Sequence, residues 1–109
     1  MISWDDFQKI EIRSGTILEV TDFPKAKKPA YQLKIDFGPL GIRQSSAQIT
    51  QYYQKEALIG KQIVAVVNFP PKQIANFFSE CLVLGVYDEQ ENVVLLQPER
   101  PVKNGQKIG

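Results

Sequence analysis

The stretch EIRSGTILEV, residues 11–20, decides the fold that we expect for this chain. Ile12, Ile17 and Val20 are placed as in one long strand, and Gly15 stands in its middle. A glycine inside a strand often marks a bulge or a sharp bend, because it has no side chain to pack. A long, bent strand can serve both sides of a small barrel. We therefore predict a bulge or bend at Gly15 in the first strand of such a barrel.

Downstream of this strand, strand signals alternate with turn signals. The segment YQLKIDF, residues 31–37, alternates strictly between apolar and polar side chains, which indicates a half-buried strand. Small polar residues at 42–47 predict a third strand, and apolar spacing at 48–58 predicts a short helix that Gly60 ends. Further strands are expected at residues 61–68, 82–87 and 93–96. This pattern is typical of an all-β, five-stranded oligonucleotide/oligosaccharide-binding (OB) barrel with short helices.

The first residues predict a short helix rather than a catalytic site. Ser3 is placed to cap the helix, and Asp6 is placed to reach back to the cap. Trp4 and Phe7 fall on one side of it. We expect Asp5 and Asp6 to complement the helix dipole, because no partner for acid–base chemistry is near them in sequence.

The composition predicts one globular domain over residues 1–109 and limits its chemistry. A formal net charge of only +1 argues against a polycationic nucleic-acid tail. The chain has no histidine and a single cysteine, Cys81, so it cannot build a Ser-His-Asp or Cys-His nucleophile or a Cys/His zinc site. We therefore expect no enzymatic activity, no cofactor and no metal. The acidic N-terminus and the lack of a long apolar stretch predict a cytoplasmic protein without membrane insertion.

Several short motifs occur in the order of a known family. Residues 11–17 resemble the opening Asp-x-Arg-x-Gly-x-Ile motif of the tRNA-binding (EMAP II-like) OB domains that are appended to some aminoacyl-tRNA synthetases, with Glu11 in place of aspartate. Residues 23–28 resemble the family's His-Pro-x-Ala loop, and residues 68–72 resemble its Asn-x-x-Pro-Arg/Lys motif. The match runs along nearly the entire chain, and the resemblance implies the same OB fold.

Two positions depart from the family pattern. Ser79 and Glu80 begin its Ser-x-Gly-Met element, but Cys81-Leu82 replaces the Gly-Met pair. Asn76 stands where the family commonly has glycine. Asparagine tolerates a left-handed backbone better than most residues, so we expect Asn76 to keep the turn.

Within the family, residues 44–50 and 68–71 are similar to the CsaA-type proteins, which are small homodimeric chaperones implicated in protein secretion. The resemblance implies a two-fold homodimer with the terminal segments at its interface. It also implies unfolded or presecretory protein clients, and the export machinery as a further partner. Residues 93–96 are apolar on both faces of their strand, so we expect them to be buried against another copy or beneath the C-terminal tail. An ATP-independent chaperone is the leading hypothesis, and recognition of folded tRNA through the same face is the alternative.

The connection at residues 68–80 carries three phenylalanines, where polar turn residues would be expected. In an OB barrel, this connection lies at the edge of the ligand face, where rings stack on bases or form pockets for an extended peptide. The alternative is that one or two of the rings plug the barrel end or a dimer seam. Small polar side chains of the third strand would line the same face, and the alternative is that they form an ordinary solvated face of the sheet. The residues predicted to bind peptide are Ser45, Ser46, Gln48, Thr50, Asn68, Phe69, Pro70, Pro71, Phe77 and Phe78.

The dense basic cluster of the chain lies in the loop before the second strand, at Lys25, Lys27 and Lys28. Attraction of phosphate there would be local and sensitive to salt, and the alternative is an ordinary solvated loop. The residues predicted to contact RNA are Arg13, Lys25, Lys27, Lys28, Lys34, Lys72 and Ser79.

Overall fold

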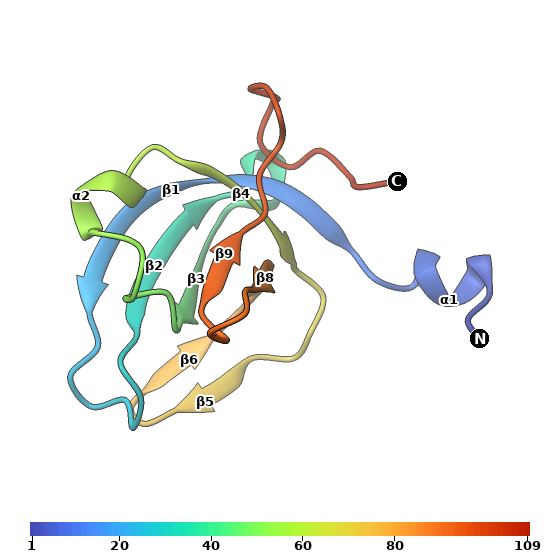
Figure 1. The fold of residues 1–109 in the computed structure, drawn as a ribbon. Coiled ribbons are helices and arrows are strands. Elements are labelled where there is room, and N and C mark those ends of the chain that lie inside the picture. The colour runs from blue at the N-terminus through green and yellow to red at the C-terminus, as the bar shows by residue number, and fades with distance from the viewer.

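One long strand, β1, organises the sheet. The computed structural model describes residues 1–109 and is a nearly closed antiparallel barrel (Figure 1). Five strands are hydrogen-bonded in the order β3-β2-β1-β4-β7. They are β1 (Ile12–Asp22), β2 (Tyr31–Asp36), β3 (Ile42–Ala47), β4 (Gln62–Val66) and β7 (Leu82–Val83). The predicted five-stranded OB-type barrel is confirmed.

β1 pairs with a different neighbour in each half. Residues 12–16 pair with β4, and residues 16–22 pair with β2. The other edge of the first half is covered by the C-terminal tail. Ser14 donates its backbone N–H to Gln106 at 3.0 Å and its hydroxyl to Lys103 at 2.7 Å. One strand thus joins both sides of the barrel and holds the tail.

Gly15 has a packing role rather than the predicted role in a bulge. The bulge of β1 lies two residues on, between Ile17 and Glu19. A Cβ atom at Gly15 would lie 2.7 Å from the Ile35 side chain and 2.8 Å from the Phe37 ring. Both of these side chains are fully buried. The missing side chain therefore leaves the space that two core residues fill.

The core comes from alternate residues of the strands. Leu33, Ile35 and Phe37 are buried, as the strict alternation of residues 31–37 predicts. They belong to one cluster of twelve buried residues, which also contains Ile17. The β2 strand therefore presents one face to the interior and the other to solvent.

The N-terminal helix stands apart from the barrel (Figure 1). α1 (Trp4–Gln8) has the predicted capping box, because Ser3 and Asp6 each accept the backbone N–H of the other. No residue of α1 is buried. No helix of this chain is long and apolar enough to cross a membrane.

The second α-helix is shorter than predicted. α2 (Lys55–Leu58) occupies only the end of the expected 48–58 segment. The preceding residues are tied to the barrel instead, because the Tyr53 carbonyl accepts the Tyr31 hydroxyl at 2.8 Å and the Tyr53 hydroxyl accepts the Leu95 N–H at 2.9 Å. Long-range bonds hold this segment in turns. A 3-10 helix, η1 (Gly38–Leu40), joins β2 to β3.

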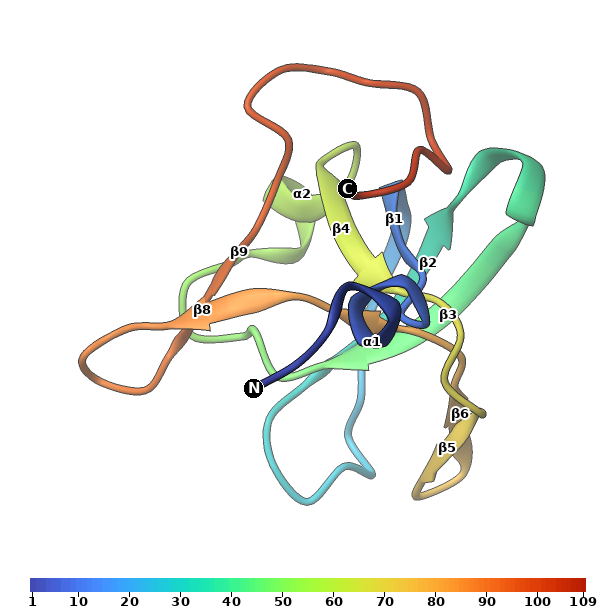
Figure 2. The same cartoon turned by 90° about the vertical axis from the view of Figure 1, so that its right-hand side faces the viewer.

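Two hairpins extend from the barrel in different directions (Figure 2). The connection at residues 68–80 contains the hairpin β5 (Lys72–Ile74) and β6 (Phe77–Ser79). Its turn has a left-handed residue at Ala75, with φ 54°, rather than at the expected Asn76. Ile74 pairs with Phe77, so Ala75 and Asn76 form a two-residue turn. Such hairpin turns take positive φ at their first central position, which is Ala75 here.

The predicted strand at 82–87 is divided by a change of partner. The Leu84 N–H donates to Val64 of β4, while its carbonyl accepts the N–H of Leu96. Beyond Leu84 the chain leaves the barrel and forms a second hairpin, β8 (Gly85–Tyr87) and β9 (Val93–Leu95). The last strand therefore belongs to a projecting hairpin rather than to the barrel.

Gly15→Ala is expected to lower the free energy of unfolding by about 1–3 kcal/mol, the usual cost of overpacking a core. The added methyl group would meet the buried Ile35 and Phe37 side chains at under 3 Å. Urea unfolding followed by circular dichroism measures the change. Gly109→Ala is the matched control, because nothing lies within 4 Å of a Cβ there. Equal stability of the two variants would contradict the packing role of Gly15.

Candidate binding groove

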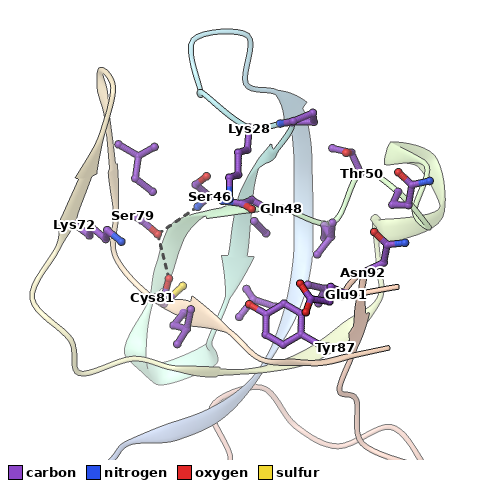
Figure 3. A pocket seen from close by; sticks show the side chains of 18 of the residues that line it. Lys28, Ser46, Gln48, Thr50, Lys72, Ser79, Cys81, Tyr87, Glu91 and Asn92 are labelled. Carbon is purple, nitrogen blue, oxygen red and sulfur yellow. Dashed lines mark hydrogen bonds between the residues drawn. The ribbon is translucent and has the colours of Figure 1, made fainter. Parts of the chain in front are cut away.

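The two hairpins form the walls of a groove whose floor is the end of β3 and the residues that follow it (Figure 3). The groove encloses about 870 Å³. Residues 46–51 line it without a break, and the β1–β2 loop reaches it through Lys28 and Pro29. A volume of this size lies in the ordinary range of ligand sites.

Part of the predicted site meets in this groove. Ser46, Gln48 and Thr50 line the floor, as expected for small polar side chains of the third strand and its continuation. The predicted residues that line the groove are Ser46, Gln48, Thr50, Phe69 and Pro70 for peptide, and Lys28, Lys72 and Ser79 for RNA. The aromatic loop, the polar strand and two lysines therefore share one concave surface.

The three phenylalanines have three different environments. Phe69 is 56% exposed and lines the groove. Phe77 is only 9% exposed and packs against the Phe23 ring, with 5.4 Å between centroids. Phe78 is 51% exposed but does not line the groove. Phe77 is thus a core ring under the β1–β2 loop, as the alternative allowed, and only Phe69 is available to a ligand in the groove.

Ser45 does not line the groove, contrary to the sequence prediction. It is 1% exposed, and its hydroxyl donates to the Cys81 carbonyl at 3.0 Å. The Ser79 hydroxyl donates to the same carbonyl at 3.1 Å and accepts the Ser46 N–H at 3.2 Å (Figure 3). These bonds close the barrel by joining the segment 79–81 to β3. Ser45 therefore has a structural role, because its hydroxyl group is part of this seam between the segment 79–81 and β3.

Asn68 and Arg13 also hold backbone rather than face the groove. The Asn68 amide donates to the Lys9 carbonyl at 2.7 Å and accepts the Glu11 N–H at 3.0 Å. Arg13 donates to the Gly105 carbonyl at 3.1 Å and pairs with Glu11 at 3.0 Å. Both side chains fix the terminal segments, so these two predicted contacts do not lie in the groove.

The remaining predicted contacts lie outside the groove on exposed surface. Lys34 pairs with Glu19 at 3.6 Å beside a second, smaller hollow of about 260 Å³. Lys25 and Lys27 are exposed in the loop that brings Lys28 to the groove, and Pro71 is exposed beside Pro70. The structure therefore does not bring Lys34, Lys25, Lys27 and Pro71 into the groove.

Sequence reasoning missed one wall. Tyr87, Glu91 and Asn92 line the groove from the β8–β9 hairpin (Figure 3). Tyr87 is 74% exposed, so its ring is as available as that of Phe69. The acidic turn after Tyr87 lies between the strands predicted at 82–87 and 93–96, and no ligand contact is predicted there. The signal that could have identified this wall is an aromatic residue directly before that turn.

A short network fixes this wall in place. The Tyr52 hydroxyl donates to the Asp88 carboxylate, and Asn92 donates to Tyr52 at 3.4 Å. The hydrogen bond between Tyr52 and Asp88 raises the pKa of Tyr52 and lowers the pKa of Asp88. The β8–β9 turn is thus attached to the loop that continues the groove floor.

The fold and groove define the chain as a binding domain of the OB class, and comparison with known proteins gives its family. Residues 12–107 match the family described as "Putative tRNA binding domain", and the chain belongs to that family. It is 37% identical over 107 residues to a methionine–tRNA ligase of Thermococcus kodakarensis and 39% identical over 110 residues to that of Nanoarchaeum equitans. These matches cover 98–99% of this chain, which spans only 14% of the length of each ligase.

Two solved structures match this chain over its whole length, and both are described more specifically than the family is. The CsaA chaperone protein from Picrophilus torridus is 57% identical, with a TM-score of 0.94 and complete coverage of both chains. The CsaA chaperone from Bacillus anthracis is 54% identical, with a TM-score of 0.95 and coverage of 100% of this chain and 99% of that one. This chain is therefore similar over its whole length to proteins described as CsaA chaperones.

We expect the Cys81 thiol to be unreactive in the folded protein. Burial raises the pKa of Cys81 to about 11, and the thiolate is the reactive form. Alkylation by iodoacetamide at pH 7.5 should be slower than that of free cysteine by about two orders of magnitude, since free cysteine has a pKa near 8.5. Mass spectrometry measures the rate, which should rise as the pH approaches 11.

The same protein unfolded in urea is the control and should react at the rate of free cysteine. Because the folded-state pKa is raised, the stability linked to the neutral thiol is complete below the unfolded-state pKa. It is lost as the pH rises toward about 11. Rapid alkylation of the folded protein at pH 7.5 would contradict the buried, neutral thiol.

Proposed function

We propose that this protein is a non-enzymatic, ATP-independent homodimeric chaperone of the cytoplasm that binds unfolded or presecretory polypeptides in the groove. The observation that carries the proposal is the exposure of Phe69 and Tyr87 in one groove above a floor of small polar side chains. Sequence identity of 54–57% over the whole chain to proteins described as chaperones supports it. The non-enzymatic part rests on a sequence without histidine and with one cysteine.

The groove chemistry suits an extended polypeptide. Phe69, Pro70 and Tyr87 provide apolar surface, and burying one large apolar side chain against such surface stabilises a complex by about 1.5–3 kcal/mol. Ser46, Gln48 and Thr50 offer hydrogen-bond donors and acceptors that match a peptide backbone. Contacts of this kind do not depend on one client sequence. Two grooves in a dimer would raise weak single contacts to useful avidity for a long client.

Binding of folded tRNA is the second candidate, and a specific observation favours it. Lys28 and Lys72 line the groove together with Phe69, which is the combination of cations and a ring that single-stranded or looped RNA requires. The family match over residues 12–107 supports the same candidate. Phosphate contacts would make such binding strongly dependent on salt.

One titration separates the two candidates. A denatured presecretory protein and bulk tRNA are each titrated into the protein at low and high salt. For a polypeptide client, Phe69→Ala should weaken binding about five- to thirtyfold, the equivalent of 1–2 kcal/mol of lost burial, with weak salt dependence. For tRNA, the dependence on salt should be steep, and Lys72→Ala should reduce its slope by about one.

Phe78→Ala is the matched control for the loss of a ring. Phe78 is 51% exposed and Phe69 is 56% exposed, but Phe78 lies outside the groove. Equal losses of client binding in the two variants would contradict binding in the groove. Absence of binding by both ligands would contradict both candidate functions.

The homodimer is the second part of the proposal, and exposed apolar side chains at the terminal segments support it. Trp4 is 81% exposed on α1, and Val86 and Val94 are cross-strand partners with exposed side chains in the β8–β9 hairpin. Monomeric proteins rarely leave such surface uncovered. Burial of α1 against a second copy would remove the exposed tryptophan from water.

Trp4→Glu is expected to shift the protein from dimer to monomer. A carboxylate in an apolar interface opposes association, because burial of an unpaired charge is costly. Light scattering after size-exclusion chromatography measures the mass. Ile59→Glu is the control, since Ile59 is also exposed and directly follows α2. α2 lies on the barrel, away from α1 (Figure 1). A Trp4→Glu protein that stays dimeric would contradict an interface that includes α1.

A further inference from the structure

The groove carries opposite charges on its two walls. Lys72 lies on the β5–β6 wall, and Lys28 reaches the groove from the β1–β2 loop (Figure 3). Glu91 lies on the opposite wall, in the β8–β9 turn (Figure 3). The ion pairs of the chain involve Lys9, Arg13, Lys34, Lys55 and Arg100. All three groove charges are therefore exposed and unpaired.

Asp88 and Glu91, two acidic residues of the β8–β9 turn, have different environments. Asp88 holds the turn, because its carboxylate accepts the N–H of Gln90 at 3.0 Å, the N–H of Asn92 at 2.9 Å and the Tyr52 hydroxyl. Glu91 has no such bond and has a left-handed backbone with φ 60°. Glycine or asparagine would be the usual residue at that position. The turn therefore keeps a free carboxylate in the groove where a smaller residue would fit its backbone better.

We propose that the groove selects polypeptide segments that carry an acidic group at one end and a basic group at the other. This inference rests on the proposed function and names the class of segment that the same groove binds. Lys28 and Lys72 would pair with the acidic group, and Glu91 with the basic group. Ser46 and Gln48 lie between the two charged walls (Figure 3). They would face the residues between the two charged ends of such a segment. A uniformly anionic ligand such as RNA would meet the carboxylate of Glu91 as a repulsive charge.

Three families of peptides test the charge preference. Each has two to six apolar residues, including phenylalanine, between its charged ends, which are Asp and Lys, Asp and Asp, or Lys and Lys, with blocked termini. The mixed peptides should bind about three- to tenfold more tightly than either like-charged family, as two exposed ion pairs allow. The preference should decrease at high salt, because the charges are exposed to solvent. Fluorescence anisotropy of labelled peptides measures the affinities.

Glu91→Lys should convert the preference to the peptides with two acidic ends. Glu89→Lys is the matched control, because it makes the same charge change in the same exposed turn but does not line the groove. Glu91→Gln should remove the preference for mixed peptides over those with two acidic ends, without reversing it. Circular dichroism checks that each variant is folded.

The outcomes separate this inference from the proposed function. If the three peptide families bind equally, or if Glu89→Lys changes the preference as much as Glu91→Lys, the charge selection is wrong. The chaperone proposal then stands on the titration with Phe69→Ala. Binding of the long client without binding of any peptide family would also overturn the charge selection. Absence of both client and peptide binding would overturn the chaperone proposal as well.

Discussion

The close approach of β1 to the buried end of β2 is the constraint on which the rest of the structure depends. It is possible because residue 15 has no side chain, so that Ile35 and Phe37 occupy the space where a Cβ atom would stand. β1 can then pair with β4 over residues 12–16 and with β2 over residues 16–22. The same arrangement exposes one edge of its first half, which the tail covers through bonds to Ser14. The exchange of pairing partners by β1 and the docking of the tail therefore both occur next to this packed contact.

Closure of the barrel also creates the groove. The segment 79–81 is bonded to β3 through the hydroxyls of Ser45 and Ser79, and this seam fixes the base of the β5–β6 hairpin. A few residues later, Leu84 changes its partner from β4 to the segment after β9, which directs the second hairpin out of the barrel. The two walls therefore diverge from one short stretch of chain. Their separation is set by backbone pairing, and the bond from Tyr52 to Asp88 holds the β8–β9 wall in place.

The sequence was sufficient for the barrel because local patterns and the fold agree there. Strict alternation at 31–37 and the capping box at Ser3 are short-range signals, and both appear as predicted. It was insufficient for the groove, because which face a side chain takes depends on long-range pairing. Ser45 and Ser46 are neighbours with similar chemistry, yet one is buried in the seam and the other lines the groove. The Tyr87 wall was missed because its hairpin forms only where Leu84 leaves the barrel.

Net charge is a poor guide to what such a groove binds, because screening limits each exposed charge to its immediate surroundings. At physiological salt the screening length is about 8 Å, so a ligand responds to the few side chains next to it rather than to the whole molecule. A formal net charge of +1 therefore conceals a surface with separate basic and acidic walls. A polyanion gains at Lys28 and Lys72 and loses at Glu91, whereas a chain with both signs of charge gains at each wall. The placement of one carboxylate in a turn thus bears on whether an OB groove of this family favours nucleic acid or polypeptide.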